Sequence, residues 1–182
     1  MTTLQADRER EGGPVRLIPW GVDDLPLLEL LVGDPAMMAH LGGPEALSRI
    51  AERQRRYQTA GSRQFKILFG HRREGVGWVG YWERSWGGEQ VYEMGWAVVP
   101  AFQGRGIASK AAAQVVARAR LERRRIAIHA FPAVENLASN AVCRRLGFTL
   151  VGQPALEYPI GNLMTCNDWR LAARPGELDS SR

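Results

Sequence analysis

One passage of the chain restricts its topology more than any other: two strand-like segments flank a helix. Residues 90–99 are apolar and strand-like up to Pro100, and residues 126–131 have the composition of a buried strand. Between them, residues 107–123 carry apolar side chains at helical spacing. A strand–helix–strand connection of this kind predicts two parallel strands joined by a crossover, within an otherwise antiparallel sheet.

The other apolar patterns complete an α/β fold of the α+β type. Further strands are predicted over residues 15–18, 64–69, 76–86, 149–158 and 163–173. Further helices are predicted after Asp24, from Pro44 to Tyr57, and over residues 136–146. Gly87 and Gly88 predict a hairpin turn. The predicted order of elements is therefore β-α-α-β-β-β-α-β-α-β-β.

A short loop with two glycines precedes the predicted helix 107–123. Gly104 and Gly106 lack a Cβ atom, which permits positive φ and lets a phosphate come close to the backbone. The first amides of a helix have no partner within the helix, so this position favours an anion. Arg105 and Lys110 add positive charge. The loop predicts an anion site, and a helix-start turn without a ligand is the alternative.

Two motifs of the chain are informative together. Gln103, Gly106 and Ala108 fit the pattern [QR]-x-x-G-x-[GA]. Asn136, Ser139 and the triplet 146–148 (Leu-Gly-Phe) form the second motif. Both motifs resemble signatures of the GNAT superfamily of N-acetyltransferases. The motifs stand in the family's order, and the predicted elements resemble the GNAT fold over nearly the whole chain, most of all its RimJ/RimL-like branch. The resemblance implies a mixed, mostly antiparallel sheet of about seven strands, with splayed fourth and fifth strands and about four flanking helices.

The same resemblance implies acetyl-CoA as the co-substrate and no metal. In the family the glycine loop cradles the pyrophosphate of coenzyme A, and the pantetheine arm lies along the splayed fourth strand. A backbone amide of that strand would bind the thioester oxygen. The implied cofactor-binding residues are Trp96, Ala97, Val98, Val99, Gln103, Gly104, Arg105, Gly106, Ile107, Ala108 and Asn136.

Acetyl transfer to an amine requires a proton acceptor and a way to release the thiolate. Glu93, ten residues before Gln103, resembles the family's general base; an exposed strand residue or a structural ion pair is the alternative. Cys143 stands where many relatives carry a tyrosine that acts as the general acid. The other interpretation of Cys143 is a small buried cysteine that packs the helix. Ser139 is a second candidate acid, or an ordinary first-turn serine. Release of the thiolate without an acid also stays open.

The acceptor site is less well defined by the sequence. His40 lies in a connection that borders the acceptor site in relatives. Trp82 belongs to an aromatic group, with Trp78, Tyr81 and Trp86, that fits either an acceptor wall or core packing. His129 lies in a predicted buried strand, where a hydrogen-bonded core histidine is the expectation.

Length and charge limit the broad class. The 182 residues suit one domain over residues 14–173, with flexible tails at 1–13 and 174–182. The net charge is +5 and the pI about 9.8, but the arginine clusters are scattered and no nucleic-acid motif accompanies them, so nucleic acid is not an expected partner. No apolar run or leader indicates a membrane, and the two cysteines fit a reduced, cytoplasmic and bacterial setting.

The resulting functional prediction is an enzyme that transfers acetyl from acetyl-CoA to a primary amine in a ternary complex. The amine belongs to a small molecule or a protein N-terminus. The alternative is a GNAT-fold module that binds acyl-CoA without catalysis, as a sensor or partner subunit. A homodimer stays open.

Overall fold

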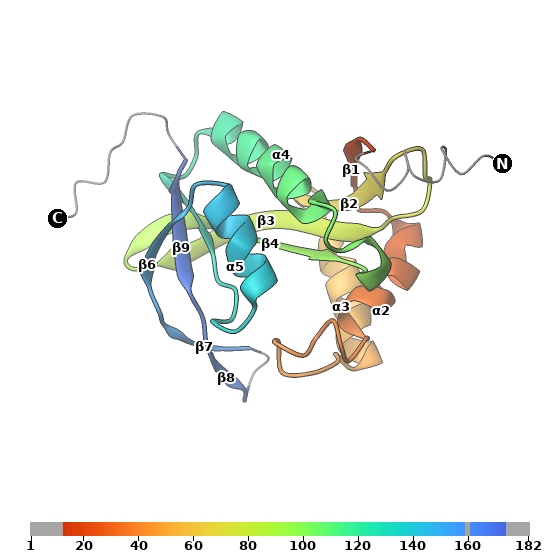
Figure 1. Cartoon of the computed structure of the whole chain (residues 1–182), viewed down its shortest axis with the longest axis horizontal. Helices are drawn as coiled ribbons and strands as arrows, with labels where there is room; N and C mark the ends of the chain where they lie inside the picture. Colours follow the sequence, from red (N-terminus) through yellow and green to blue (C-terminus); the bar gives the residue numbers. More distant parts are fainter. Residues whose placement is uncertain (1–12, 159–160, 174–182) are drawn as a thin grey trace. The chain divides into compact units, whose positions relative to one another are not determined.

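The computed structural model describes residues 13–158 and 161–173 (Figure 1). Its strands are β1 (Val15–Pro19), β2 (Gln64–Phe69), β3 (Gly77–Trp86), β4 (Glu89–Val98), β5 (Ala127–Ala130), β6 (Thr149–Gly152), β7 (Ala155–Glu157), β8 (Leu163–Thr165) and β9 (Asp168–Ala172). Its helices are α2 (Leu25–Val32), α3 (Leu47–Tyr57), α4 (Ile107–Glu122) and α5 (Leu137–Arg145), with short 3-10 turns η1 (Val22–Asp24) and η2 (Pro100–Phe102). Apart from Gly13, the predicted tails lie outside the described residues.

The main sheet confirms the predicted fold class. Seven strands follow the order β1-β2-β3-β4-β5-β9-β6. β4 and β5 pair in parallel, through the crossover that contains α4, whereas β5–β9 and β6–β9 pair antiparallel. The β4–β5 ladder joins Tyr92 to Ile128 and Glu93 to His129, although β4 continues to Val98. The parallel pairing is therefore short compared with the strand that carries it.

The C-terminal strands correct the sequence prediction. Each of the two predicted strands, 149–158 and 163–173, is divided: β6 and β9 join the main sheet, whereas β7 and β8 form a separate two-stranded sheet. The register shifts between Leu150 and Gly152, and Pro154 follows without a backbone N–H to donate to a ladder. Instead the Pro154 carbonyl accepts from the Cys166 amide at 3.0 Å. Apolar alternation continues through such an interruption, which hides it from sequence reasoning.

The described residues group into two compact units that share three elements. The first unit comprises residues up to Ala39, Gly43–Gly80 and Trp96–Ala111, and the second comprises His40–Gly42, Tyr81–Gly95 and the residues after Ala111. β3, β4 and α4 each begin in one unit and continue without interruption into the other.

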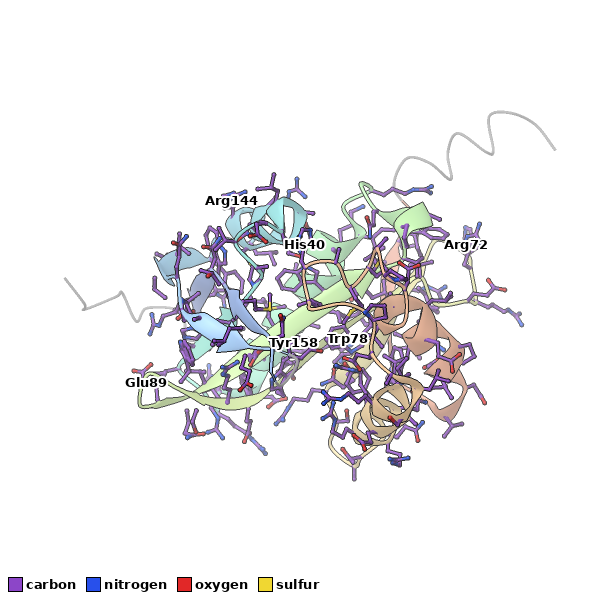
Figure 2. All side chains as sticks on the ribbon, turned by 90° about the horizontal axis from the view of Figure 1, so that it is seen from below. His40, Arg72, Trp78, Glu89, Arg144 and Tyr158 are labelled. Atoms are coloured by element: carbon purple, nitrogen blue, oxygen red, sulfur yellow. The ribbon has the colours of Figure 1, made fainter. Side chains whose placement is uncertain are left out.

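The part of α4 that belongs to the second unit presents the predicted apolar stripe. Ala112, Val115, Val116 and Ala119 are all buried. The last residue of α4, Glu122, accepts hydrogen bonds from the hydroxyls of Tyr81 (2.6 Å) and Tyr92 (2.5 Å). Figure 2 labels Glu89 where β4 leaves the hairpin turn and Arg144 on α5.

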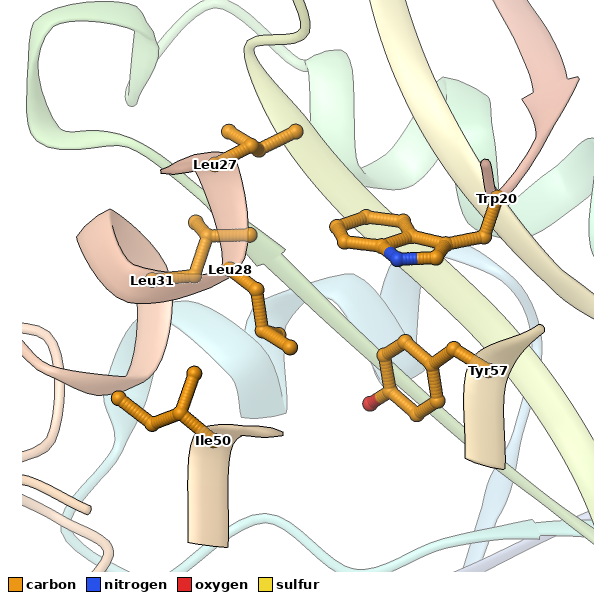
Figure 3. Packing of buried hydrophobic residues seen from close by; sticks show 6 residues of the cluster. All are labelled: Trp20, Leu27, Leu28, Leu31, Ile50 and Tyr57. Carbon is orange, nitrogen blue, oxygen red and sulfur yellow. The ribbon is translucent and has the colours of Figure 1, made fainter. Parts of the chain in front are cut away.

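The first unit has its own apolar core, built from the segment after β1 and from α2 and α3. Figure 3 shows its six members: Trp20, Leu27, Leu28, Leu31, Ile50 and Tyr57. The indole of Trp20 donates to Gln54 Oε1 at 2.7 Å, so the polar atom of this buried ring is satisfied. The Tyr57 ring stacks on Trp78, which lies on β3, with centroids 5.5 Å apart. These contacts hold α2 and α3 together and place α3 against β3.

Candidate functional site

The glycine loop has the backbone geometry that its sequence predicts. Gly104 and Gly106 have φ of +74° and +70°, and α4 begins directly afterwards at Ile107. A Cβ atom built at either glycine would meet nothing within 4 Å. The surface over both glycines is thus open, and a ligand can approach the backbone there.

The side chain of Gln103 fastens this loop to the end of β4. Its Nε2 donates to the Val98 carbonyl at 2.9 Å, and its backbone amide donates to Pro100 at 3.1 Å. The start of the motif therefore has a structural role that its residue type explains: an amide side chain can reach a free strand carbonyl.

Positive charge gathers beside the loop around the ring of Phe102. The guanidinium carbons of Arg72 and Arg105 lie 5.1 and 5.2 Å from the ring centroid. Arg105 also donates to the Ala101 carbonyl at 3.0 Å. Arg72, labelled in Figure 2, was missed by the sequence prediction because it belongs to the β2–β3 connection, far from the motif.

The backbone groups at the end of β4 differ in whether they face β3 or face away from it. The Val99 amide donates to Val76 at 3.0 Å, so it already has a partner. Backbone groups alternate in direction along a strand, so Val98 and Trp96 face away from β3. The Val98 carbonyl agrees with this assignment, since it accepts from a side chain and not from the ladder. Ala97 faces β3, where a Cβ on Gly77 would lie 2.3 Å from its carbonyl oxygen.

Glu93 forms an ion pair on the second unit's part of β4. Its Oε2 lies 2.5 Å from Arg84 Nη1, and the two side chains are 18% and 28% exposed. The setting is thus not the purely apolar one that Tyr92, Met94 and Trp96 indicate. Burial raises the pKa of the Cys166 thiol; Glu93 raises that pKa further and Arg84 lowers it. Cys166 is a neighbour that the sequence did not reveal.

A buried carboxylate, Asp168, organises the side chains around this ion pair. Its Oδ1 lies 2.6 Å from His129 Nδ1, and its Oδ2 accepts from the Trp86 indole at 2.7 Å. His129 is buried, as expected for a hydrogen-bonded core histidine. The Phe131 ring packs against Trp86 and stacks with His129, at centroid distances of 4.9 and 5.8 Å.

The predicted residues of α5 have different surroundings. Asn136 caps the helix, because its Oδ1 accepts from the Ser139 amide at 3.0 Å. Ser139 is half-buried in the first turn. Cys143 is completely buried, and burial raises the pKa of its thiol to about 12. This environment favours the packing role for Cys143 over that of a proton donor.

Asn140, one residue after Ser139, is the most extensively bonded side chain of this helix. Its Nδ2 donates to the carbonyls of Ala133 (2.9 Å) and Asn136 (2.8 Å). Its Oδ1 accepts from Asn167 Nδ2 and from the Trp169 indole, both at 2.7 Å. Asn140 thereby ties α5 to β9 and to the connection after β5; Figure 1 shows α5 beside β9. No sequence motif predicted this role.

The structure says least about the two residues predicted for the acceptor site, His40 and Trp82. His40 is exposed in the connection between α2 and α3, and Trp82 is half-buried on β3. Of the predicted residues, the loop and Trp96–Val99 belong to the first unit, whereas Glu93, Asn136, Ser139, Cys143, His40 and Trp82 belong to the second. Over residues 13–158 and 161–173, no group of three His, Cys, Asp or Glu side chains could hold a metal, and no helix could cross a membrane.

The sheet order, the parallel β4–β5 pair and the loop before α4 define a GNAT-fold protein. A family model described as an acetyltransferase (GNAT) domain matches residues 15–149. The chain therefore belongs to the GNAT acetyltransferase family. A search of curated proteins gave no match.

Solved structures share the fold at low sequence identity. An acetyltransferase of the GNAT family from Bacillus anthracis has a TM-score of 0.73 and 17% identity, with 90% of this chain and 98% of that chain covered. Spermidine N-acetyltransferase from Vibrio cholerae, in complex with CoA and spermine, has a TM-score of 0.71 and 16% identity, covering 87% and 95%. RimL, a ribosomal L7/L12 alpha-N-protein acetyltransferase in complex with coenzyme A, has a TM-score of 0.70 and 21% identity, covering 87% and 93%.

Proposed function

We propose that the protein transfers the acetyl group of acetyl-CoA directly to a primary amine. The observation that carries this proposal is the open loop at Gly104 and Gly106, immediately before α4. Family membership supports acetyl transfer, and the similar spermidine and RimL enzymes are both in complex with coenzyme A. The first of these enzymes is named for a small-molecule amine and the second for a protein, so the proposed acceptor is a small-molecule amine or a protein N-terminus.

The loop would hold the phosphates of coenzyme A. Backbone amides at Gly104 and Gly106 and at the start of α4 would donate to the pyrophosphate. Arg72 and Arg105 are placed around Phe102 to attract a further phosphate group. The Trp96 and Val98 amides, which face away from β3, would hydrogen-bond the pantetheine arm and the thioester oxygen as negative charge develops there.

Glu93 would take the proton that the attacking amine loses. The amine nitrogen forms a bond to the thioester carbon, and the carbon–sulfur bond then breaks. The amine proton passes to the Glu93 carboxylate or through it to solvent, and coenzyme A leaves as the thiol or thiolate. Ser139 would be the hydroxyl donor to the leaving sulfur if one is used. Cys143 is not proposed for that role because its thiol is completely buried.

The setting proposed for this chemistry is the cytoplasm, where both buried thiols would stay reduced. The rival proposal is an acyl-CoA-binding module without catalysis. The partly exposed carboxylate of Glu93 favours the enzyme, because a binding module does not require a base there.

Cofactor binding is tested by a charge placed in the loop. Acetyl-CoA should raise the melting temperature of the wild type by mass action. Gly106→Asp should abolish this shift, since a carboxylate would face the pyrophosphate. Gly106→Asn is the matched control: it has the same size and the same strain at positive φ, but no charge, so it should retain part of the shift. A folded Gly106→Asp variant with an unchanged shift would remove the loop assignment.

Catalysis is tested by thiol release over a panel of amines. Turnover with at least one amine supports the enzyme. A protein that binds acetyl-CoA and turns over none of a broad panel would be the sensor or partner module instead.

A further inference from the structure

The ion pair of Arg84 and Glu93 differs from a purely structural one in its accessibility. In the neighbouring His129–Asp168 pair both side chains are buried, with 5% and 8% of their surface exposed. Arg84 and Glu93 are 28% and 18% exposed, so both a cation and an anion stay within reach of a ligand.

The Arg84 guanidinium is held in place by two aromatic rings. Its carbon lies 4.8 Å from the Trp86 centroid and 4.7 Å from the Phe131 centroid. Both rings are themselves fixed, Trp86 by its hydrogen bond to the buried Asp168 and Phe131 by packing against Trp86. A guanidinium that is placed in advance loses little conformational freedom when a ligand binds.

Most N–H groups of the Arg84 guanidinium donate no hydrogen bond to other described residues. The hydrogen bond of its Nη1 to Glu93 is the one side-chain hydrogen bond described for it. A guanidinium has several N–H donors in a planar fork that matches a carboxylate. The remaining N–H groups can therefore donate hydrogen bonds to an anionic group of a ligand beside Glu93.

A ligand complementary to this pair carries an ammonium and a carboxylate side by side. Its amine would lie against Glu93 and its carboxylate against Arg84. A polyamine fits less well, because its further ammonium groups would meet Arg84, and like charges repel. A peptide N-terminus offers Arg84 only a neutral carbonyl, which is a weaker acceptor than a carboxylate.

We infer that the acceptor is a free α-amino acid, with Arg84 as the residue that selects its carboxylate. The inference rests on the proposed acetyl transfer, in which Glu93 faces the amine. Trp86 and Phe131, both half-buried, add an apolar wall beside the guanidinium, so apolar amino acids are the first to test.

The test compares acceptors that differ only in the carboxylate. L-Phenylalanine is paired with 2-phenylethylamine, and L-methionine with 3-(methylthio)propylamine; spermidine represents the polyamines. With the wild type, kcat/KM should be at least about tenfold higher for the amino acid of each pair. Arg84→Gln should lose this preference, measured within the variant as the ratio of kcat/KM for the two members of each pair. Arg84→Lys, which keeps the charge but not the fork, should be intermediate. Arg124→Gln, an exposed arginine on the same unit, removes one charge elsewhere and should leave the preference unchanged.

A binding measurement separates failure of this inference from failure of the proposed function. In the presence of coenzyme A, L-phenylalanine should raise the melting temperature of the wild type more than 2-phenylethylamine does at the same concentration, and this difference should be absent in Arg84→Gln. Such binding without turnover would support the amino-acid site and reject catalysis. Turnover that favours spermidine or ignores the carboxylate, or a preference that survives in a folded Arg84→Gln, would overturn the inference.

Discussion

At the scale of single residues, the ion pair of Glu93 and Arg84 joins the two strands of the β3–β4 hairpin. Glu93 is the one carboxylate in the predicted strand 90–99, but its partner, Arg84, lies on the preceding strand of the hairpin. Which residues face each other across a hairpin depends on the register, and none of the motifs refers to it. Asp168 could not be anticipated either, because it bonds Trp86 from a strand far along the chain.

The proposed role of Glu93 is tested by Glu93→Gln. The amide keeps the size of the side chain but cannot accept a proton, so the rate should fall by about 10²–10⁴, the usual contribution of a general base. Acetyl-CoA affinity should change little, because the loop and the β4 amides are untouched. Steady-state kinetics from pH 7 to 9.5 should show the loss shrinking as pH rises, since more of the acceptor amine is already deprotonated in solution. Wild-type turnover at neutral pH would leave Glu93 with only its structural ion pair.

The raised pKa of the Cys143 thiol predicts a loss of folding stability at alkaline pH. Burial raises the pKa of its thiol from 9.0 to about 12 in the folded chain. Between these values the unfolded chain loses the proton while the folded chain keeps it, so folding stability falls as pH rises above 9. From pH 8 to pH 10 the loss should be about 1.4 kcal/mol.

Urea unfolding at pH 8, 9 and 10 measures this loss, with Cys143→Ala as the comparison. The variant should be less stable at every pH, because it leaves a cavity, but its stability should fall less between pH 8 and 10. Cys166 is present in both proteins and cancels from the difference. If the free energy of unfolding fell equally with pH in the two proteins, the pKa of Cys143 would not differ between the folded and unfolded chain, and the prediction would be wrong.

At the scale of elements, periodicity predicts long segments well and interruptions poorly. The strand–helix–strand passage and the glycine loop were predicted because each has a local cause: apolar spacing in α4 and positive φ at Gly104 and Gly106. The division of the C-terminal strands was not predicted, because its cause is non-local. The Cys166 amide pairs with Pro154, and Asn167 and Trp169 pair with the α5 residue Asn140. The same distinction holds for the site, where the glycine loop was predicted and Arg72 was not.

At the scale of the whole molecule, two compact units share continuous secondary structure. Their boundaries fall inside β3, β4 and α4, at Gly80, Gly95 and Ala111. A helix or strand that loses its hydrogen bonds on one side of such a boundary exposes those on the other. We therefore expect the described chain to unfold as one cooperative domain, as its length indicates.

A cavity in the first unit tests this cooperativity. Leu28 is buried in the first unit's core (Figure 3), and Leu28→Ala should lower the free energy of unfolding by about 2–5 kcal/mol. Native-state hydrogen exchange should show the most protected amides of β5 and β9, which belong to the second unit, losing as much free energy of opening as those of β2. Leu47→Ala, on the exposed side of α3 in the first unit, should leave both sets nearly unchanged. If Leu28→Ala weakened protection in β2 alone, the two units would unfold separately, and the expectation of a single domain would be wrong.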